Sequence, residues 1–363
     1  MDDRATEPIE RPLYLVTGYP KFIARRVAES ILARDPTARV AALVQERHKA
    51  EAEAWEAQLA EPRLRLLMGD VGSMHLGLST SEYRELTFGC TDVLHAAEWS
   101  FLGSPRTELD RVNVEGTRAV LEIATDCRKL RRFTHFSTVF VAGDRVGVVA
   151  EDELSSGQTF RNAYEETKFE AELLVRRAMG QLPCTVLRPS IVIGDSKTGE
   201  IDRFEGPYAI AILLVTSPLA VPLPLPGDGV APLNVVPIDY VVAASMAIHH
   251  DPRAVGRTFH IVDPNPTSSR RIYELIAQRQ GKKLPRLSLG YKLTDALLKL
   301  PGLERLTREQ RMAIAYVNHL SFFGSRNTLE LLDGTGIRCP PIEGYLDNLI
   351  EYVRDAYRKK RES

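Results

Sequence analysis

The first half of this chain alternates short apolar runs with longer segments of helical spacing, and this pattern constrains the fold more than any other feature. Strands that alternate with helices of this length predict a parallel sheet with helices on both faces. The apolar runs lack a period-two pattern, which fits strands that are buried on both sides. The expected strands are residues 13–17, 40–44, 64–68, 92–95, 133–138 and 184–187, and the expected helices are 22–33, 47–59, 108–127 and 162–179.

The composition along the chain changes after about residue 195, and proline and glycine concentrate between residues 218 and 237. We therefore expect an α/β fold in which residues 11–195 form a Rossmann-type, doubly wound parallel sheet that binds NAD(P). A smaller C-terminal α+β substrate-binding region is expected over 196–233 and 263–358. Residues 234–262 are expected to return to the main sheet, and residues 1–10 and 359–363 are expected to be flexible ends.

The segment VTGYPKFIA, residues 16–24, lies where the first expected strand meets the first helix. In dinucleotide-binding folds this turn carries three glycines, which allow the tight turn, the approach to pyrophosphate and the helix packing. Here Gly18 is kept, but Lys21 and Ala24 stand at the second and third positions. Two interpretations stay open for Lys21: its ammonium pairs with a cofactor phosphate, or its Cβ obstructs the site. Pro20 is compatible with the first helical turn.

The end of the second expected strand bears on the choice between NAD and NADP. An acidic residue there would bind the ribose hydroxyls of NAD, whereas an arginine would accept the 2′-phosphate of NADP. Gln45 favours neither cofactor, whereas Glu46 favours NAD(H). Arg47, followed by His48 and Lys49, slightly favours NADP(H), although a solvated, charged helix start explains the same residues.

Tyr164 is the only tyrosine that is followed four residues later by a lysine, Lys168. On a helix these two side chains share one face. A phenol has an unperturbed pKa of about 10, so a neighbouring ammonium would help it to exchange protons near neutral pH. Ser137 and Thr138 fall at the end of the fifth strand, where open α/β sheets place their sites. A hydroxyl there could hold a substrate carbonyl while Tyr164 donates the proton.

Asn113, in the segment VNVEGT, lies near the start of the long helix. It is either a polar residue on the helix face or a link in a proton relay to Lys168. Polar elements at several compatible points of one fold are a stronger indication of a site than any of them alone.

Together these segments resemble the extended short-chain dehydrogenases/reductases, in particular the branch of thioester reductases and fatty acyl-CoA reductases. The resemblance covers roughly residues 12–262. It implies that Thr138, Tyr164, Lys168 and Asn113 are the catalytic residues. The matching stretches are VTGYPKFIA, MGDV, DVLHAAE, RVNVEGT, HFSTVFVAG, NAYEETKFEAE, LRPSIVIGDSKTG and NVVPIDYV.

The resemblance also implies cofactor contacts at Asp70, Val71, Ala96, Ala97 and Lys168 and in the segment 189–192, which complete the sets of expected contacts. The expected cofactor contacts are Gly18, Pro20, Lys21, Phe22, Ile23, Gln45, Arg47, Asp70, Val71, Ala96, Ala97, Lys168, Pro189, Ser190, Ile191 and Val192. The expected substrate contacts are Glu98, Trp99, Phe101 and Phe140.

The leading hypothesis is an NAD(P)H-dependent reductase that transfers hydride to a carbonyl-type carbon, in an acyl thioester or in a bulky ketone- or quinone-like intermediate. The substrate is expected to be lipophilic, because the apolar residues 209–225 and 291–300 could line a pocket or lie against a membrane. A thioester would come from a separate carrier protein. Two alternatives stay open: a nucleotide-sugar epimerase or dehydratase that retains NAD, and a cofactor-sensing protein with a decayed site.

The composition argues against several other classes of protein. Lys and Arg number 47 against 48 Asp and Glu, so the chain carries no charge excess of the kind that binds nucleic acid. The four cysteines have no metal-ligand spacing, and we expect reduced thiols and no metal. The acidic N-terminus is unlike a secretory signal, and prolines interrupt the longest apolar stretch. We therefore expect a cytoplasmic monomer or homodimer, with peripheral membrane association left open.

Overall fold

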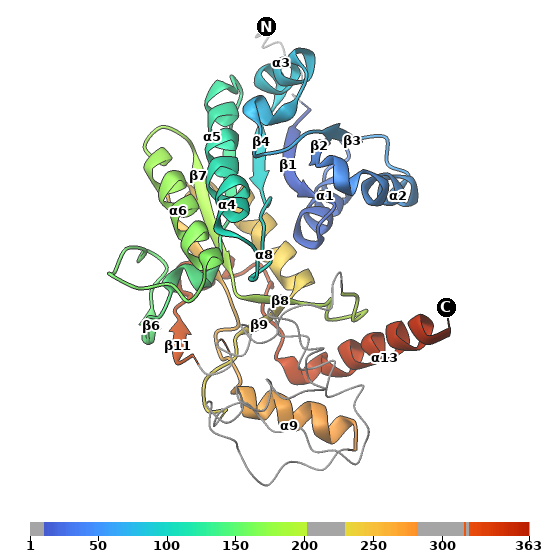
Figure 1. Cartoon of the computed structure of the whole chain (residues 1–363), viewed down its shortest axis with the longest axis vertical. Coiled ribbons are helices and arrows are strands. Elements are labelled where there is room, and N and C mark those ends of the chain that lie inside the picture. The colour runs from blue at the N-terminus through green and yellow to red at the C-terminus, as the bar shows by residue number, and fades with distance from the viewer. Residues whose placement is uncertain (1–10, 202–228, 282–315, 317–318, 363) are drawn as a thin grey trace, which may run out of the picture.

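A seven-stranded parallel sheet forms the centre of the computed structural model, which describes residues 11–201, 229–281, 316 and 319–362 (Figure 1). Its order is β10-β7-β5-β4-β1-β2-β3, and all neighbouring strands run parallel. The chain builds one side of the sheet outward from β1 and then returns to build the other side from β4. Sheets of this type bind ligands where the order reverses, between β1 and β4. The strands are β1 (Leu13–Tyr19), β2 (Arg39–Val44), β3 (Leu64–Met68), β4 (Asp92–His95), β5 (Arg132–Phe136), β7 (Cys184–Pro189) and β10 (Thr258–Ile261).

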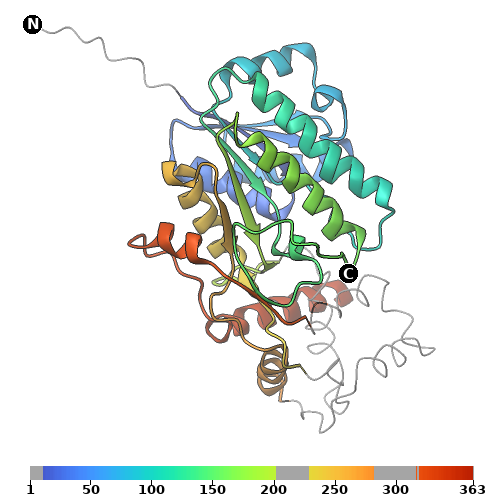
Figure 2. The same ribbon diagram turned by 90° about the vertical axis from the view of Figure 1, so that its left-hand side faces the viewer.

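Helices cover both faces of this sheet, as the expected doubly wound fold requires (Figures 1 and 2). Successive residues of β1 supply different cores: Tyr14 and Val16 face one, whereas Leu13 and Leu15 face the other. This two-sided burial explains why the strands lack a polar face. The first core is closed by α1 (Phe22–Arg34), α2 (Lys49–Leu59), α8 (Ile238–His250) and α12 (Arg326–Leu332), and the second by α3 (Thr80–Gly89), α5 (Gly116–Asp126) and α6 (Ala163–Ala178).

The single helix expected over residues 108–127 is interrupted. A short helix, α4 (Arg106–Leu109), runs into a π-helical segment, η3 (Asp110–Glu115), before α5 begins. Such π-helical turns occur mostly at functional sites, and this one contains Asn113. The sequence analysis also did not predict α3, which begins with a capping box between Ser79 and Glu82.

The chain after β7 forms smaller units below the main sheet. Of residues 234–262, β10 pairs with β7 in the main sheet, whereas β9 (Val235–Pro237) pairs with β8 (Ile191–Ile193) in a separate parallel sheet. A further parallel pair joins β6 (Gly147–Val149) to β11 (Ser321–Phe323). The expectations for residues 1–10, 209–225 and 291–300 lie outside the described residues.

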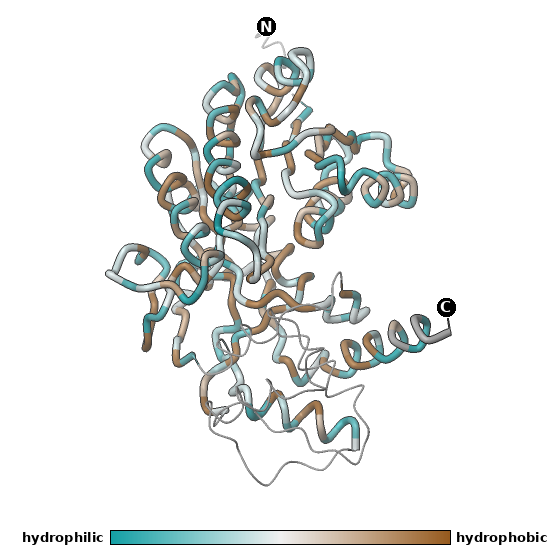
Figure 3. Tube along the Cα trace, viewed as in Figure 1, coloured by the Kyte–Doolittle hydropathy of each residue, from teal (hydrophilic) through white to brown (hydrophobic). Residues whose placement is uncertain are grey.

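A third core joins the β8–β9 pair to α9 (Ser269–Arg279), the turn η6 (Ile342–Gly344) and α13 (Leu346–Glu362). Apolar and polar residues alternate along α9 and α13 in Figure 3, as expected for helices that bury only one face. Within the described ranges, no helix combines the length and the apolar character needed to cross a bilayer.

A buried ion pair fixes the end of β5, where the candidate hydroxyls lie. Glu172 on α6 accepts hydrogen bonds from Arg188 on β7, from Nη2 to Oε1 at 2.7 Å and from Nε to Oε2 at 2.9 Å. The Oγ of Ser137 donates to the same Oε2 at 2.7 Å. Glu172 is fully buried and Arg188 is 1% exposed. Burial alone would raise the pKa of Glu172, but the charge and hydrogen bonds of Arg188 outweigh it and lower this pKa below its ordinary value.

Replacing Glu172 by alanine should lower the free energy of unfolding by about 3–5 kcal/mol, because Arg188 would stay buried without its counter-ion. Urea denaturation measures this change. The control is Glu85→Ala on α3, which removes a carboxylate that pairs with Arg65 at the half-exposed surface. That substitution should cost less than about 1 kcal/mol. Equal losses in the two variants would contradict the assigned importance of the buried pair.

Candidate active site

The turn after β1 approaches the end of β4 so closely that only glycine fits. Gly18 has a φ of +92°, and a Cβ built on it would lie 2.7 Å from the carbonyl oxygen of Ala96 and 2.8 Å from the nitrogen of Ala97. Both the backbone conformation and the contact therefore exclude a side chain. Gly18 thus allows the tight turn that is expected of the first glycine in the motif. The same close approach brings Ala96 and Ala97 next to this turn.

Lys21 directs its charge across this turn toward the end of β4. It is the N-cap of α1, so the helix begins at Phe22 and Pro20 precedes it rather than lying in its first turn as expected. The ammonium of Lys21 donates a hydrogen bond to the carbonyl oxygen of Glu98. The first turn of α1 contains no acidic residue, so its partial positive charge remains available to an anion. This placement favours the phosphate-pairing interpretation of Lys21. Ile23 packs against the first core.

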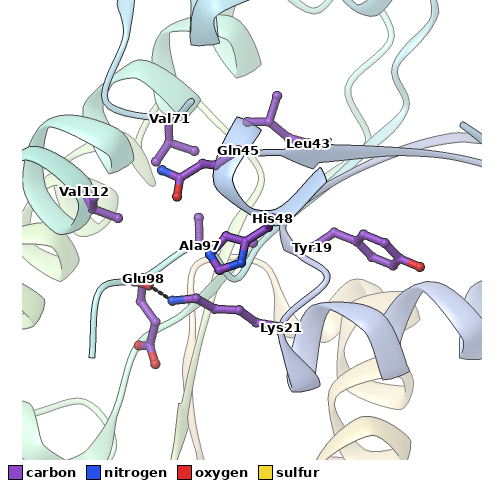
Figure 4. A pocket seen from close by; sticks show the side chains of 10 residues that line it. Tyr19, Lys21, Leu43, Gln45, His48, Val71, Ala97, Glu98 and Val112 are labelled. Atoms are coloured by element: carbon purple, nitrogen blue, oxygen red, sulfur yellow. Dashed lines mark hydrogen bonds between the residues drawn. The ribbon is translucent and has the colours of Figure 1, made fainter. Parts of the chain in front are cut away.

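A pocket of about 360 Å³ opens between this turn and the ends of β2 and β4 (Figure 4). It lies at the reversal of strand order, where open α/β sheets bind dinucleotides. Apolar side chains line most of it, together with a few groups that can form hydrogen bonds, as is typical of cofactor sites. The lining residues are Gly18, Tyr19, Lys21, Leu43, Gln45, His48, Val71, Ala97, Glu98 and Val112.

Asp70 forms a polar wall behind the pocket. Its Oδ1 accepts hydrogen bonds from Gln45 Nε2 and from the backbone N of Gly72, each at 2.9 Å, and its Oδ2 pairs with Arg111 at 2.8 Å. Burial alone would raise the pKa of Asp70, but these contacts outweigh burial and lower it. An ionised Asp70 beside the buried Val71 can accept hydrogen bonds from a ligand. Arg111 was not predicted as a site residue, although it is the first residue of the stretch RVNVEGT.

Two cations converge on the indole of Trp99. The guanidinium of Arg47 lies 4.2 Å from the ring centroid, and the ammonium of Lys21 lies 5.9 Å from it. Arg47 also donates a hydrogen bond to Gln45. The basic residues that the sequence analysis associated with cofactor phosphate therefore lie together.

Tyr164 and Lys168 lie one turn apart on α6, as the sequence predicts, and they meet at Glu98. The phenol of Tyr164 donates a hydrogen bond to Glu98 Oε2 at 3.2 Å. Lys168 Nζ lies 3.3 Å from the same oxygen and donates to the carbonyl oxygen of Phe136 at 2.7 Å. The Lys168 side chain is 2% exposed and that of Glu98 is 27% exposed. Glu98 was expected to contact the substrate, and its bonds with Tyr164 and Lys168 were not predicted.

The surroundings of Tyr164 hold its phenol in the protonated form. Burial raises its pKa well above the ordinary value, and the negative charge of Glu98 and the nearby Tyr316 raise it further. A hydrogen bond with Thr138 acts in the opposite direction. Thr138 is buried at the end of β5, and its Oγ1 accepts a hydrogen bond from the backbone N of Phe140 at 3.3 Å. Tyr164 therefore carries a proton that it could donate, and the hydroxyl of Thr138 lies beside its phenol.

Asn113 braces the end of β4 against α6. Its Oδ1 accepts from the backbone N of Trp99 at 2.8 Å, and its Nδ2 donates to the carbonyl oxygen of Trp99 at 3.1 Å. Nδ2 also donates to Thr167 Oγ1 at 3.0 Å. These contacts support a positioning role for Asn113, and the relay to Lys168 stays a prediction.

The remaining expected contacts lie around this centre. Pro189 ends β7, the buried Ser190 follows, and Ile191 and Val192 belong to β8. The ring of Phe140 packs edge-on against Tyr316, with centroids 4.5 Å apart. Tyr316 was not predicted as a site residue. No local pattern connects it with Tyr164, which lies 152 positions earlier, on α6. Phe101 is 45% exposed.

A buried histidine below the site was also missed. His95 at the end of β4 bonds through Nδ1 to Thr17 Oγ1 at 2.7 Å and through Nε2 to Thr117 Oγ1 at 3.0 Å. Burial and the charge of Lys168 lower the pKa of His95 to about 3, so it is neutral at physiological pH. Its position at a strand end, two residues before Ala97, was the available signal. In the ranges that the structure describes, no three His, Cys, Asp or Glu side chains gather as a metal site.

The comparisons with known proteins agree with this geometry. The family model described as male sterility protein, an NAD-binding family, matches residues 16–245. A component of the linear gramicidin synthase of Brevibacillus parabrevis is 24% identical over 310 residues, which are 80% of this chain and 6% of that protein. Fatty acyl-CoA reductase wat of Drosophila melanogaster is 26% identical over 51% of this chain and 41% of that protein. The chain therefore spans less than half the length of either relative.

Solved structures share the fold over nearly the whole chain. The terminal R domain from the myxalamid PKS-NRPS biosynthetic pathway aligns with a TM-score of 0.79 and 25% identity, over 94% of this chain and 90% of that one. UDP-glucuronic acid 4-epimerase from Bacillus cereus in complex with NAD aligns with a TM-score of 0.68 and 19% identity, over 95% of this chain and 99% of that one. At that identity the epimerase shows a shared fold only.

Replacing Gly18 by alanine should destabilise the protein more than the same change at Gly256. Both residues have positive φ values, +92° and +76°, but a Cβ on Gly256 would meet no atom within 4 Å. Gly256→Ala should therefore lower the free energy of unfolding by only about 1 kcal/mol, the cost of a positive φ at alanine. Gly18→Ala should cost about 1–3 kcal/mol more, because the backbone at Ala96 must move. Chemical denaturation measures both, and equal costs would refute the close contact.

Proposed function

The chain belongs to the male sterility protein family of NAD-binding proteins, and from this membership we propose that it is an NAD(P)H-dependent reductase of carbonyl-type carbons, with acyl thioesters as the leading substrates. One observation carries the proposal: Tyr164, Lys168 and Thr138 converge at the carboxyl edge of the sheet, and Glu98 links this group to the neighbouring pocket. This arrangement combines a proton donor, a cation and an orienting hydroxyl with a site that suits a dinucleotide.

The residues around the pocket fit a nicotinamide dinucleotide. The turn at Gly18 admits no side chain, and the N-terminus of α1 is free of acidic residues in its first turn. Lys21 and this turn would hold the pyrophosphate, and Gln45 and Asp70 would hold the adenosine. Lys168 would bind the nicotinamide ribose. When bound, the dinucleotide supplies the hydride for the electrophilic carbon.

The chain's own residues then handle the oxygen of the substrate. Thr138 orients this oxygen, and the hydroxyl of Tyr164 donates its proton to it as negative charge develops. The ammonium of Lys168, one helical turn away, stabilises the tyrosinate that remains. The pKa of Tyr164, raised by burial and by Glu98, favours the role of acid over that of base.

A reductase fits better than the two alternatives. The fatty acyl-CoA reductase of Drosophila is a relative in sequence, whereas the nucleotide-sugar epimerase shares the fold alone. A decayed site is difficult to reconcile with the convergence of Tyr164, Lys168 and Thr138 beside an open pocket. NAD that stays bound through purification would favour the epimerase, and exchangeable NADPH would favour the reductase.

We further propose that a separate carrier protein presents the thioester. The myxalamid R domain and the gramicidin synthase component, both similar to this chain, come from PKS-NRPS or synthase systems. The core formed by β8, β9, α9 and α13 would carry the substrate-binding region, with a lipophilic substrate. Within this proposal the reductase is a cytoplasmic monomer or homodimer that can associate with a membrane surface.

Replacing Tyr164 by phenylalanine should lower turnover of an acyl thioester by about 10²- to 10⁴-fold, because the proton donor is lost. NADPH consumption measures turnover, and calorimetry should show an unchanged Kd for NADPH. Tyr83→Phe is the matched control, because the phenol of Tyr83 lies on α3 and bonds to Asp126; it should retain full activity. Full activity in the Tyr164 variant would refute the assignment.

Arg47 should distinguish NADPH from NADH if it binds the 2′-phosphate. Arg47→Ala should then raise the Kd for NADPH by about tenfold, the loss of one charge-assisted contact, and leave the Kd for NADH nearly unchanged. Arg118→Ala is the control, since Arg118 lies on α5 and pairs with the exposed Glu115 at 3.1 Å. Equal effects of Arg47→Ala on the two cofactors would exclude the preference for NADP(H).

A further inference from the structure

We propose that Glu98 and Trp99 hold the dinucleotide-binding groups through displaceable side-chain contacts and thereby set the affinity for the cofactor. This inference rests on the proposed function of the site and concerns its regulation. The two side chains contact groups at both ends of the site: Glu98 meets Tyr164 and Lys168, and Trp99 meets Arg47. We call these two residues the 98–99 segment.

The carboxylate of Glu98 occupies the catalytic end of the site. A single oxygen, Oε2, lies 3.2 Å from the Tyr164 phenol and 3.3 Å from the Lys168 ammonium. A substrate oxygen that takes a proton from Tyr164 must approach the same phenol, and a ribose hydroxyl bound by Lys168 must approach the same ammonium. Both ligand groups therefore compete with Glu98. The competition is substantial because Lys168 is almost fully buried, where an ion pair is screened less than at the surface.

The phosphate end of the site is held by the same segment. Lys21 donates to the carbonyl oxygen of Glu98, and the charges of Arg47 and Lys21 lie 4.2 Å and 5.9 Å from the Trp99 ring centroid. Figure 4 shows the Lys21 side chain reaching Glu98 across the pocket, while the Glu98 carboxylate extends away from Lys21. A phosphate is a stronger partner for both cations than a carbonyl or an aromatic ring. Phosphate binding would therefore draw them away from the segment.

The backbone of the segment is anchored on both sides, so the displacement must come from side chains. The backbone N of Ala97 donates to Thr17 Oγ1 at 3.2 Å. Asn113 holds both the N and the carbonyl oxygen of Trp99, at 2.8 and 3.1 Å. Glu98 therefore leaves Lys168 by rotation of its own side chain, toward the solvent that it already reaches. The brace by Asn113 keeps the segment in place for its return.

The affinity that the protein shows for a dinucleotide is reduced by whatever fraction of molecules has Glu98 on Lys168. Removing the carboxylate should therefore tighten binding, which is the opposite of what is expected for a residue that contacts the cofactor favourably. Tighter binding after removal of the Glu98 carboxylate would therefore distinguish this role of Glu98 from direct, favourable contact with the cofactor.

The test measures NADP⁺ binding to the full chain by calorimetry. Glu98→Ala should lower the Kd by about threefold to tenfold, as expected for the loss of one partly screened ion pair, and Glu98→Gln should act in the same direction. The control Glu85→Gln removes a carboxylate from the Arg65 pair on α3 and should leave the Kd unchanged. Unchanged or weaker binding in both Glu98 variants overturns the inference.

A second measurement does not depend on how the Glu98 variants fold. The chain has two tryptophans, so Trp55→Phe leaves Trp99 as the only indole. Binding of NADP⁺ should change the fluorescence of Trp99 as Arg47 and Lys21 leave its ring. If NADP⁺ binds and the Trp99 spectrum does not change, the inference is overturned and the proposed function is not. If the unmodified chain and every variant fail to bind NADP⁺ and NADPH, the proposed function fails and the inference with it.

Discussion

The close approach of Gly18 to the backbone of Ala96 and Ala97 is the contact on which the site depends. It brings the turn after β1 against the end of β4 at the point where the strand order reverses. From there, Lys21 bonds to Glu98, and Glu98 bonds to Tyr164 on α6. A side chain at position 18 would separate two loops that both line the pocket. The absence of a side chain at this position therefore keeps the turn after β1 close to the end of β4.

Two buried basic side chains, Arg188 and Lys168, pair with carboxylates that differ in their exposure to solvent. Arg188 and Glu172 are both enclosed, and Ser137 adds a further hydrogen bond, so their geometry is fixed. Lys168 is equally buried, but its partner Glu98 keeps about a quarter of its side chain in solvent. A charge pair that is enclosed on both sides cannot exchange its partner without leaving a buried charge uncompensated, whereas a pair that is open to solvent on one side can exchange its partner. Both pairs bond to the end of β5, because Lys168 donates to the carbonyl oxygen of Phe136 and Glu172 accepts from Ser137.

The sheet could be predicted because its strands are buried on both faces, and the apolar runs of β1, β2 and β4 carry that signal in the sequence alone. Tyr164 and Lys168 could be paired because helical geometry brings residues four apart together. The contacts of Asn113 with Trp99 and Thr167 could not be predicted, because they depend on the π-helical segment around Asn113 and on its packing against α6, which no local pattern indicates. The pairing of β9 with β8, and the approach of Tyr316 to Phe140, depend on tertiary contacts between distant segments. Lys21 was recognised as unusual, but only the structure shows where its flexible side chain ends.

The last strand of the main sheet, β10, comes from a part of the chain well beyond β7, with which it pairs. During synthesis, β7 therefore emerges with an unpaired edge, and the sheet is completed only after the intervening residues and α8 have left the ribosome. The segment between β7 and β10 is consequently inserted within the sheet rather than attached after it. A graft of the proposed substrate-binding region could not use a single junction after β7, because that cut would remove the edge strand β10. The graft would have to keep β10 and replace segments on both sides of it, since β8 and β9 precede the end of this insertion whereas α9 and α13 follow β10.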